Sequence, residues 1–339
     1  LALREAVPRL EATVLSKDPD YTAREYGVRS IPRDNPRLVY KALGDADLLI
    51  SGGGGLLQDI TSPKSIIYYL GIVAMARLLG KPVFLYAQGI GPISTAMGRA
   101  LVRLVVNRVN AITVRDPDSK DELAALGVTR PRLEVTADPV LGLKPSGIES
   151  KRGRDILVSL GVNNGPVAGI SVRRWKGDGA YTKVLARAAD DLAADGWQVL
   201  LVPMHCPGDI AACREVASLM NEKAFLLEHY TDYMSLLSLT ANLDLAIGMR
   251  LHFLIFSIIF GVPVVGIPYD PKVNRFLQSV GLPSGFSVEK LDYHELSSGI
   301  EHVLDNREKI IAGLKERVVP LRAEALKNAS LVAELLRGL

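Results

Sequence analysis

Short apolar runs of strand length recur along the chain, and longer segments with helical spacing separate them. A chain that alternates in this way is typical of parallel sheets with helices on both faces. The runs of the first half are residues 12–16, 47–51, 82–88, 111–116 and 133–138, and those of the second half are residues 167–172, 198–203, 224–227, 243–248 and 262–268. The pattern predicts an α/β protein with two Rossmann-like domains.

Residues 143–164 separate the two sets of runs and are rich in Gly, Pro, Ser and charged residues, as is usual for a connection between domains. We expect an N-terminal domain over residues 1–145 and a C-terminal domain over residues 146–339 that ends in helices, with a cleft between the two. The length of 339 residues allows each domain its own core. Because the chain starts at Leu1 and soon reaches its first strand, we expect the opening strand of the N-terminal domain to be missing.

Composition excludes several classes of protein. The net charge is +3, and the 40 Lys and Arg residues form no dense run interleaved with aromatic residues, so we expect no nucleic-acid partner. Cys206 and Cys213 are the only cysteines and show no CxxC spacing, so we expect neither a bound metal nor a disulfide framework. No signal peptide or membrane-spanning run is evident. These features predict a cytoplasmic protein.

One stretch has an uneven charge. Residues 60–115 contain no Asp or Glu but include Lys64, Arg77, Lys81, Arg99, Arg103, Arg108 and Arg115. A solvated basic helix face is the simplest interpretation. An acidic substrate or an anionic membrane surface could also use such a stretch.

Ligands of parallel α/β sheets bind beyond the carboxyl ends of the strands, so residues that follow each predicted strand are the candidate site residues. In the first half these include the glycines at 52–55, Gln88, Arg115 and Asp138. In the second half they include Arg173, Arg250, His252, Tyr269 and Lys272. The cations of the second set suit a small, doubly charged anion.

The most informative segment is residues 243–257, in which an apolar strand reaches Gly248 and is followed by Arg250 and His252 at the start of an apolar helix. A helix N-terminus presents unpaired N–H groups and the positive end of the helix dipole. The two side chains could therefore hold a phosphate or carboxylate and move a proton beside it. The ordinary alternative is that Arg250 pairs with a surface acid and His252 packs under a loop.

The glycine run at residues 52–55 does not fit a dinucleotide site. Leu57 stands where the third glycine is needed, and no acid follows about 20 residues later. We interpret the run as a strand-to-helix turn at which Gly53 and Gly54 let the backbone approach a ligand, with Asp59 just beyond. Packing of the helix on the sheet explains the glycines equally well.

Eight motifs in register give the chain a resemblance to a known family. They are ADLLISGGGGLLQD (residues 46–59), YAQGIGPI (86–93), ITVRD (112–116), TADP (136–139), GISVR (169–173), VPMH (202–205), GMRLH (248–252) and YDPK (269–272). Together they resemble the polysaccharide pyruvyl transferases. The chain looks most similar to the bacterial enzymes that act on the secondary cell-wall polymer to which surface-layer proteins attach.

This resemblance implies a fold like the GT-B glycosyltransferases and transfer of a pyruvyl group from phosphoenolpyruvate, with no further cofactor. The product would be a pyruvate ketal across O4 and O6 of a sugar, in this subgroup N-acetylmannosamine of a lipid-diphosphate-linked disaccharide. Arg250, the backbone of Leu251 and His252 match the family's phosphoenolpyruvate segment, and Arg173 and Lys272 match further basic residues of that site. The opening Gly/Asn-rich loop of the family has no counterpart here.

The residue types fit this chemistry independently of the family resemblance. His252 is the expected general acid, because an imidazole can give and take a proton near neutral pH. Asp59 is a candidate catalytic base. Asp138 is a second candidate, although capping of a turn is its simpler interpretation. We expect the acceptor to be bound by Gly53, Gly54, Gln88, Arg115 and Asp138.

Two other functions stay open. A nucleotide-sugar glycosyltransferase of the same architecture would need an acid for the ribose, for which Glu228 is the candidate. A non-catalytic polymer-binding protein would not need His252. The C-terminal helices are expected to pack back on the protein, with peripheral membrane contact at the inner face of the cell membrane as the alternative. The oligomeric state is not predicted.

Overall fold

The computed structural model describes residues 1–59, 63–163, 165–176, 179–229 and 232–338. The chain divides into two compact units: unit 1 comprises Leu1–Gly142 and Leu321–Leu339, and unit 2 comprises Leu143–Pro320. The expected domains were residues 1–145 and 146–339. The end of the chain therefore belongs with unit 1 and not with the second domain, because one long helix, α14 (Arg307–Arg337), starts in unit 2 and ends in unit 1.

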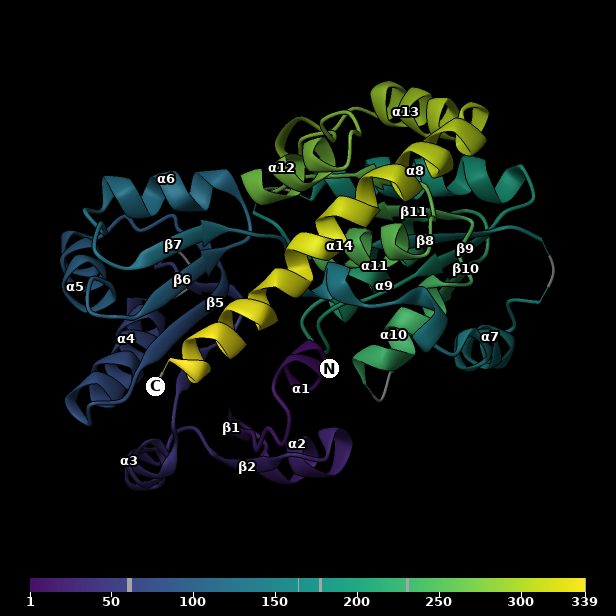
Figure 1. Cartoon of the computed structure of the whole chain (residues 1–339). Coiled ribbons are helices and arrows are strands. Elements are labelled where there is room, and N and C mark those ends of the chain that lie inside the picture. The colour runs from purple at the N-terminus through teal and green to yellow at the C-terminus, as the bar shows by residue number, and fades with distance from the viewer. Residues whose placement is uncertain (60–62, 164, 177–178, 230–231, 339) are drawn as a thin grey trace. The chain divides into compact units, whose positions relative to one another are not determined.

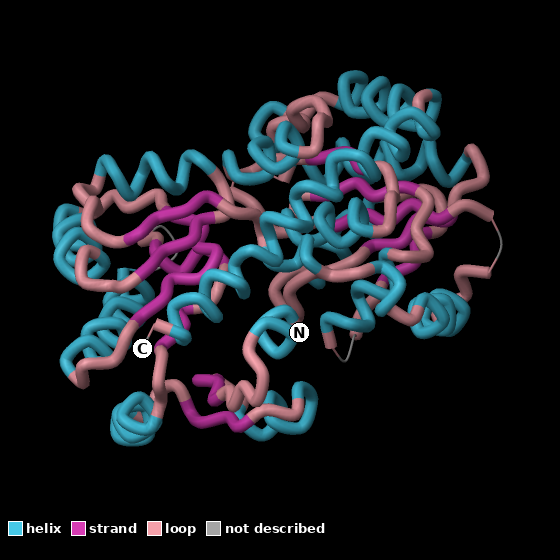
Figure 2. Tube along the Cα trace, viewed as in Figure 1, coloured by secondary structure: helices cyan, strands magenta, loops and turns pink. Residues whose placement is uncertain are grey.

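Unit 1 is built on a parallel sheet (Figures 1 and 2). Its strand order is β3-β5-β6-β7, and β4 also pairs with β5. The strands are β3 (Leu49–Ser51), β4 (Gly54–Leu57), β5 (Val83–Ile90), β6 (Ala111–Val114) and β7 (Arg132–Val135). The helices are α1 (Ala2–Ala6), α2 (Pro19–Tyr26), α3 (Pro36–Asp45), α4 (Pro63–Leu78), α5 (Ala96–Val106) and α6 (Pro117–Ala125), with the 3-10 turn η1 (Pro139–Gly142).

Unit 2 has a second parallel sheet, with strand order β10-β9-β8-β11-β12. The strands are β8 (Val167–Ser171), β9 (Gln198–Leu201), β10 (Ala224–Leu226), β11 (Leu245–Gly248) and β12 (Val264–Gly266). The helices are α7 (Ser150–Ser159), α8 (Ala180–Ala194), α9 (Ile210–Leu219), α10 (Tyr233–Thr240), α11 (Leu251–Ile259), α12 (Pro271–Ser279), α13 (Tyr293–Asp305) and the start of α14, with the 3-10 turns η2 (Pro145–Gly147) and η3 (Val288–Lys290).

The predicted α/β class with parallel sheets is confirmed, and each predicted run contains a strand. Two short strands were not predicted. Strand β2 (Arg29–Pro32) pairs with β1 (Thr13–Ser16) in a separate two-stranded sheet. Strand β4 begins in the glycine run, so the prediction of a direct strand-to-helix turn there was wrong. Strand β2 contains arginine and proline, and β4 contains two glycines. Glycine and proline are rare in strands, so residue propensity does not predict either strand.

The last turns of α14 cover part of the sheet of unit 1. Val332 of this helix is buried in one cluster with Phe84 and Tyr86 of β5, and Leu331 and Leu335 pack against the same cluster. The apolar stripe at the end of the chain therefore packs on the protein. Among the described residues, no helix is long and apolar enough to cross a membrane.

Candidate active site

Three adjacent strands of unit 2 bring the predicted cations to one edge of the sheet. Gly248, at the end of β11, lies opposite Ser171 of β8 on one side and Gly266 of β12 on the other. Arg173, Arg250 and Lys272 follow these three strand ends in the chain. Parallel pairing thus places residues from three distant segments on the same carboxyl edge, as predicted.

Arg250 is held by an acid that the sequence analysis did not identify. Its guanidinium donates from Nε to Asp209 Oδ2 at 2.9 Å and from Nη2 to Asp209 Oδ1, and the Asp209 carboxylate also accepts the His205 N–H at 3.0 Å. Asp209 is buried. Burial of Arg250 acts to lower its pKa, but the hydrogen bonds and charge of Asp209, with a smaller part from Tyr269, outweigh it and raise the pKa.

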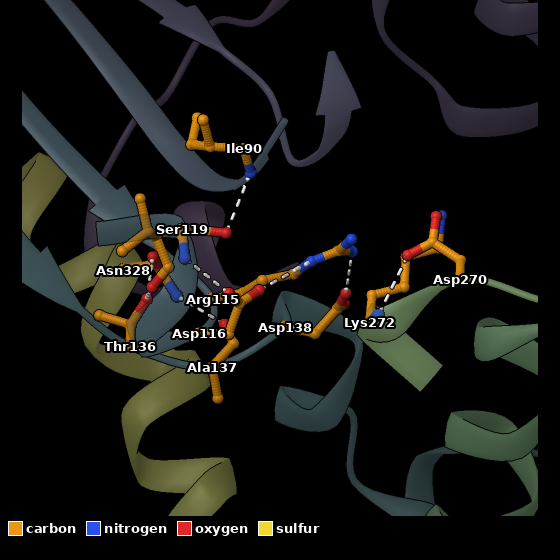
Figure 3. Close-up of polar contacts among 11 residues, drawn as sticks. Ile90, Arg115, Asp116, Ser119, Thr136, Ala137, Asp138, Asp270, Lys272 and Asn328 are labelled. Carbon is orange, nitrogen blue, oxygen red and sulfur yellow. Dashed lines mark hydrogen bonds and ion pairs between the residues drawn. The ribbon is translucent and has the colours of Figure 1, made fainter. Parts of the chain in front are cut away.

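Tyr269 links the other two cations. The Arg173 guanidinium carbon lies 4.3 Å from the centroid of the Tyr269 ring, and the Lys272 Nζ lies 5.6 Å from the same centroid. Lys272 also pairs with Asp270 at 3.0 Å (Figure 3). The aromatic face therefore holds both cations by cation–π attraction.

Two polar atoms at this edge have unused hydrogen-bonding capacity. The Ser171 hydroxyl and the Arg173 Nε are buried and have no hydrogen-bond partner within the part of the chain that the structure describes. Such atoms are rare in folded proteins, where a bound ligand or water often supplies the partner. Both atoms belong to the sheet edge at which Arg250 and Lys272 also follow strand ends, and this favours an anionic ligand.

His252 lies on the first turn of α11 with an exposed side chain, and Leu251 beside it is buried. The Arg250 side chain makes no capping hydrogen bond at this helix start. A side chain at Gly248 would bring its Cβ within 2.9 Å of the Phe253 ring, so glycine lets α11 pack closely on β11. The imidazole is therefore accessible at a helix N-terminus.

Unit 1 gathers the residues predicted after β5, β6 and β7. Arg115 Nη1 donates to Asp138 Oδ2 at 3.0 Å, with both side chains largely buried (Figure 3). Asp138 also accepts a hydrogen bond from the Val140 N–H at 3.2 Å. It therefore caps a turn, which was the simpler of the two interpretations of this residue. The Gln88 amide donates to the backbone oxygens of Ser51, at 3.1 Å, and Gly52, whereas its Oε1 has no partner among the described residues.

The glycines contribute backbone geometry. Gly54 has φ +106°, a conformation that other residues rarely adopt, and a Cβ on Gly53 would lie at van der Waals distance from the Tyr86 and Ala87 carbonyls. Gly89 has a clearer steric role: a Cβ there would lie 2.6 Å from Arg115 Nη2. Glycine at position 89 therefore makes room for the guanidinium that pairs with Asp138.

The structure places Asp59 in a supporting role. Its carboxylate is buried and accepts four hydrogen bonds, from Ser94 N and Oγ, both at 2.9 Å, and from Thr95 N at 2.8 Å and Oγ1 at 2.7 Å. The Ser94 N–H lowers the pKa of Asp59 most; burial opposes it, and the other three hydrogen bonds lower the pKa further. An acid so engaged is a weak base, and this geometry favours anchoring of α5 over the predicted catalytic role.

Asn328 is a second supporting residue that the sequence did not indicate. This buried residue of α14 accepts from Thr136 Oγ1 at 2.9 Å and donates to the Ala137 carbonyl at 3.2 Å (Figure 3). It therefore holds the two residues that precede Asp138. Asp209 could have been found because it follows a strand and precedes a helix, but an asparagine within a helix gives no such signal.

The described residues contain no group of three or more His, Cys, Asp or Glu side chains that could hold a metal ion.

Comparisons with solved structures show which known folds this chain resembles. The chain is similar to Anabaena HepE in complex with UDP and glucose (15% identity, TM-score 0.65, covering 100% of this chain and 94% of that chain). It is also similar to MnaA of S. aureus, solved with UDP (12% identity, TM-score 0.65, covering 98% and 89%). The α/β fold with parallel sheets thus has GT-B-like glycosyltransferases and epimerases as structural neighbours.

Sequence comparison identifies the family. The amylovoran biosynthesis protein AmsJ of Erwinia amylovora is 23% identical over 284 residues, which cover 78% of this chain and 67% of AmsJ. The family model described as polysaccharide pyruvyl transferase matches residues 2–271, which include every candidate residue after the strands except Lys272. The chain belongs to the polysaccharide pyruvyl transferase family.

Proposed function

We propose that the protein transfers a pyruvyl group from phosphoenolpyruvate to two hydroxyls of a sugar in a polysaccharide precursor, forming a pyruvate ketal and releasing phosphate. The observation that carries this proposal is the cluster of Arg173, Arg250 and Lys272 beside the unpartnered Ser171 hydroxyl. Phosphoenolpyruvate has a carboxylate and a phosphate on adjacent positions, so it needs several cations at one place.

The donor would be held by three cations, each with a different role. Arg250 is oriented by Asp209, which fixes the plane of its guanidinium for paired hydrogen bonds to a carboxylate or phosphate. Arg173 forms no ion pair with the described residues, so its charge is available to the ligand. Lys272 forms an ion pair with Asp270, and both side chains are about a third exposed. The ammonium group could therefore leave Asp270 and turn toward a departing phosphate.

The chemistry requires acid and then base catalysis. The imidazolium of His252 gives its proton to C3 of the enol, and the C2–C3 π electrons form the new C–H bond, which leaves an oxocarbenium centre at C2. One sugar hydroxyl adds to C2 and gives up its proton to the neutral imidazole. Phosphate then leaves C2 with the C–O electron pair. The second hydroxyl adds to C2 and gives its proton to the released phosphate, which closes the ketal and leaves His252 in its starting imidazolium form.

The acceptor would use the residues of unit 1. A sugar could form hydrogen bonds with several groups there. These are the ion pair of Arg115 with Asp138, the unpartnered Oε1 of Gln88, and the backbone at Gly53 and Gly54. We propose N-acetylmannosamine of a lipid-diphosphate-linked disaccharide as the acceptor, O4 and O6 as the bridged hydroxyls, and the cytoplasmic side of the cell membrane as the place of reaction.

Transfer from a nucleotide sugar is the alternative, because HepE and MnaA were solved with UDP. The acid expected to bind a ribose, Glu228, pairs with Arg214 at 2.7 Å on the surface. That pairing makes Glu228 a poorer ribose ligand, so the pyruvyl transferase remains the preferred proposal.

The test measures phosphate release from phosphoenolpyruvate with and without the synthetic disaccharide diphospholipid, for the wild type, His252→Ala and His294→Ala. We expect acceptor-dependent release that falls by about 2–4 orders of magnitude in His252→Ala and is unchanged in His294→Ala, whose histidine is exposed on α13. Calorimetry should show that His252→Ala still binds phosphoenolpyruvate.

Three results would count against the proposal. Binding of UDP-sugars without binding of phosphoenolpyruvate would favour the glycosyltransferase. Release that persists in His252→Ala would remove the histidine from the mechanism. Donor binding without turnover, across acceptors that differ in their sugar, would show that the proposed acceptor class is wrong.

A further inference from the structure

The three cations of the donor site are held in different ways. Arg250 forms an ion pair with the buried Asp209, and Lys272 forms one with Asp270, so both pairs are formally neutral. Arg173 forms no ion pair with a described residue, and its buried Nε has no hydrogen-bond partner there. An arginine side chain loses much conformational freedom when it is fixed. Arg173 therefore needs another contact to keep one orientation.

Two aromatic rings provide that contact. The Arg173 guanidinium carbon lies 4.3 Å from the centroid of the Tyr269 ring and 5.9 Å from that of the Trp175 ring. Both distances are within the range of about 6 Å over which a ring attracts a cation. The two rings also contact each other, with centroids 5.3 Å apart and planes inclined by 51°. Aromatic attraction therefore orients the guanidinium without neutralising its charge.

Tyr181 fixes the backbone that carries these groups. Its hydroxyl accepts a hydrogen bond from the Trp175 N–H at 3.2 Å and donates one to the Arg173 carbonyl at 3.1 Å. Tyr181 is buried in the core of unit 2, and Trp175 and Tyr269 pack against the same core. Side chains packed on a dense core keep one rotamer. We call Trp175, Tyr181 and Tyr269 the aromatic frame.

We propose that the aromatic frame positions Arg173 for the donor, and that Trp175 is a positioning residue of the reaction. This inference rests on the proposed function, because it takes phosphoenolpyruvate as the anion that Arg173 binds. A side chain that is already oriented loses little freedom when the ligand arrives, so more of the interaction energy appears as affinity. Because Asp209 and Asp270 neutralise the other two cations, the net positive charge of the cluster is that of Arg173.

A double-mutant cycle tests whether Trp175 acts through Arg173. Calorimetry measures binding of phosphoenolpyruvate by the wild type, Trp175→Leu, Arg173→Gln and the double variant. Trp175→Phe keeps a ring at the position and is the conservative variant. Trp197→Leu is the matched control, because Trp197 packs against the same core but precedes β9, at the amino edge of the sheet. Thermal melts check that every variant is folded.

We expect Trp175→Leu to lower the affinity for phosphoenolpyruvate about fivefold and Trp175→Phe to lower it by less than about twofold. Arg173→Gln should lower it about thirtyfold, the effect of lost charge-assisted hydrogen bonds. Trp175→Leu should have no further effect once Arg173 is replaced. Trp197→Leu should bind like the wild type.

Tryptophan fluorescence gives an independent measurement. Trp175 and Trp197 are the only tryptophans of the chain. An anion at Arg173 changes the electric field at the neighbouring Trp175 ring. Phosphoenolpyruvate should therefore change the emission of Trp197→Phe and leave that of Trp175→Phe unchanged. A change of equal size in both variants would contradict binding beside the frame.

The cycle is repeated with inorganic phosphate, so that the frame and the donor are tested separately. Additive losses in the cycle, or equal losses in Trp175→Leu and Trp197→Leu, would overturn the role of the frame although the donor binds. If phosphate gave the expected pattern and phosphoenolpyruvate did not bind, the frame would stand and the proposed donor would be wrong. Absence of binding of either anion by the wild type would overturn both.

Discussion

The carboxylate of Asp209 and the guanidinium of Arg250 form a two-hydrogen-bond ion pair that joins the start of α9 to the start of α11. Breaking such a pair leaves a charge without its partner. We expect Asp209→Asn to lower the free energy of unfolding by about 3 kcal/mol and the affinity for phosphoenolpyruvate about tenfold, because the guanidinium loses its orientation. Urea unfolding and calorimetry measure the two effects.

The matched control for this pair is Asp195→Asn, which changes an exposed acid of the same unit. It should leave both quantities unchanged. If Asp209→Asn bound phosphoenolpyruvate as well as the wild type, orientation of Arg250 would not matter for donor binding.

Asp59 should contribute to acid sensitivity. Its pKa is lowered in the folded state, chiefly by the Ser94 N–H, so the unfolded chain takes up the proton more readily. The stabilisation is therefore present above about pH 4, the ordinary range of an aspartate, and is lost as the pH falls below it. Asp59→Asn should lower the free energy of unfolding at pH 7 by about 2–3 kcal/mol and should lack this acid-dependent loss.

Activity separates the two roles of Asp59. At a temperature where Asp59→Asn is folded, we expect turnover within about tenfold of the wild type, whereas loss of a catalytic base would reduce it by about 2–4 orders of magnitude. Asp47→Asn, at an exposed position, serves as the control. A loss of the larger size with an intact fold would restore Asp59 as the base.

Substitution of Gly89 should weaken binding of the acceptor and leave binding of the donor unchanged. An alanine Cβ would lie 2.6 Å from Arg115 Nη2, so the guanidinium must move away from Asp138. We expect Gly89→Ala to raise the KM for the acceptor about tenfold, the effect of a lost charge-assisted hydrogen bond, with unchanged binding of phosphoenolpyruvate. Gly44→Ala, where a Cβ would meet nothing within 4 Å, is the control in steady-state kinetics. Equal KM values in the two variants would contradict a role of Arg115 in acceptor binding.

Asn328 and Thr136 should be coupled. Their side chains share a buried hydrogen bond of 2.9 Å. In a double-mutant cycle with Asn328→Ala and Thr136→Val, urea unfolding should give a coupling energy of about 1 kcal/mol. Because Asn328 also holds the Ala137 carbonyl, Asn328→Ala should raise the acceptor KM more than Thr136→Val does. Additive effects on stability would show that the two side chains act independently.

The sequence alone determined most of the secondary structure and the residues that follow the strands. Apolar runs located the strands of both main sheets except β4, because a buried parallel strand must be apolar along its length. Parallel strands end at one edge, so Arg173, Arg250 and Lys272 could be placed together, as could Gln88, Arg115 and Asp138. These predictions follow from local periodicity and from one rule of topology.

Only the tertiary structure decided which partner each polar side chain has. Asp59 was predicted as a base, but its surroundings are set by the Ser94–Thr95 turn, which approaches it from a distant part of the chain. The pairing of Asp209 with Arg250 and the docking of Asn328 on Thr136 likewise depend on contacts across many residues. A hydrogen bond forms where two groups meet in space, and sequence spacing does not record that meeting.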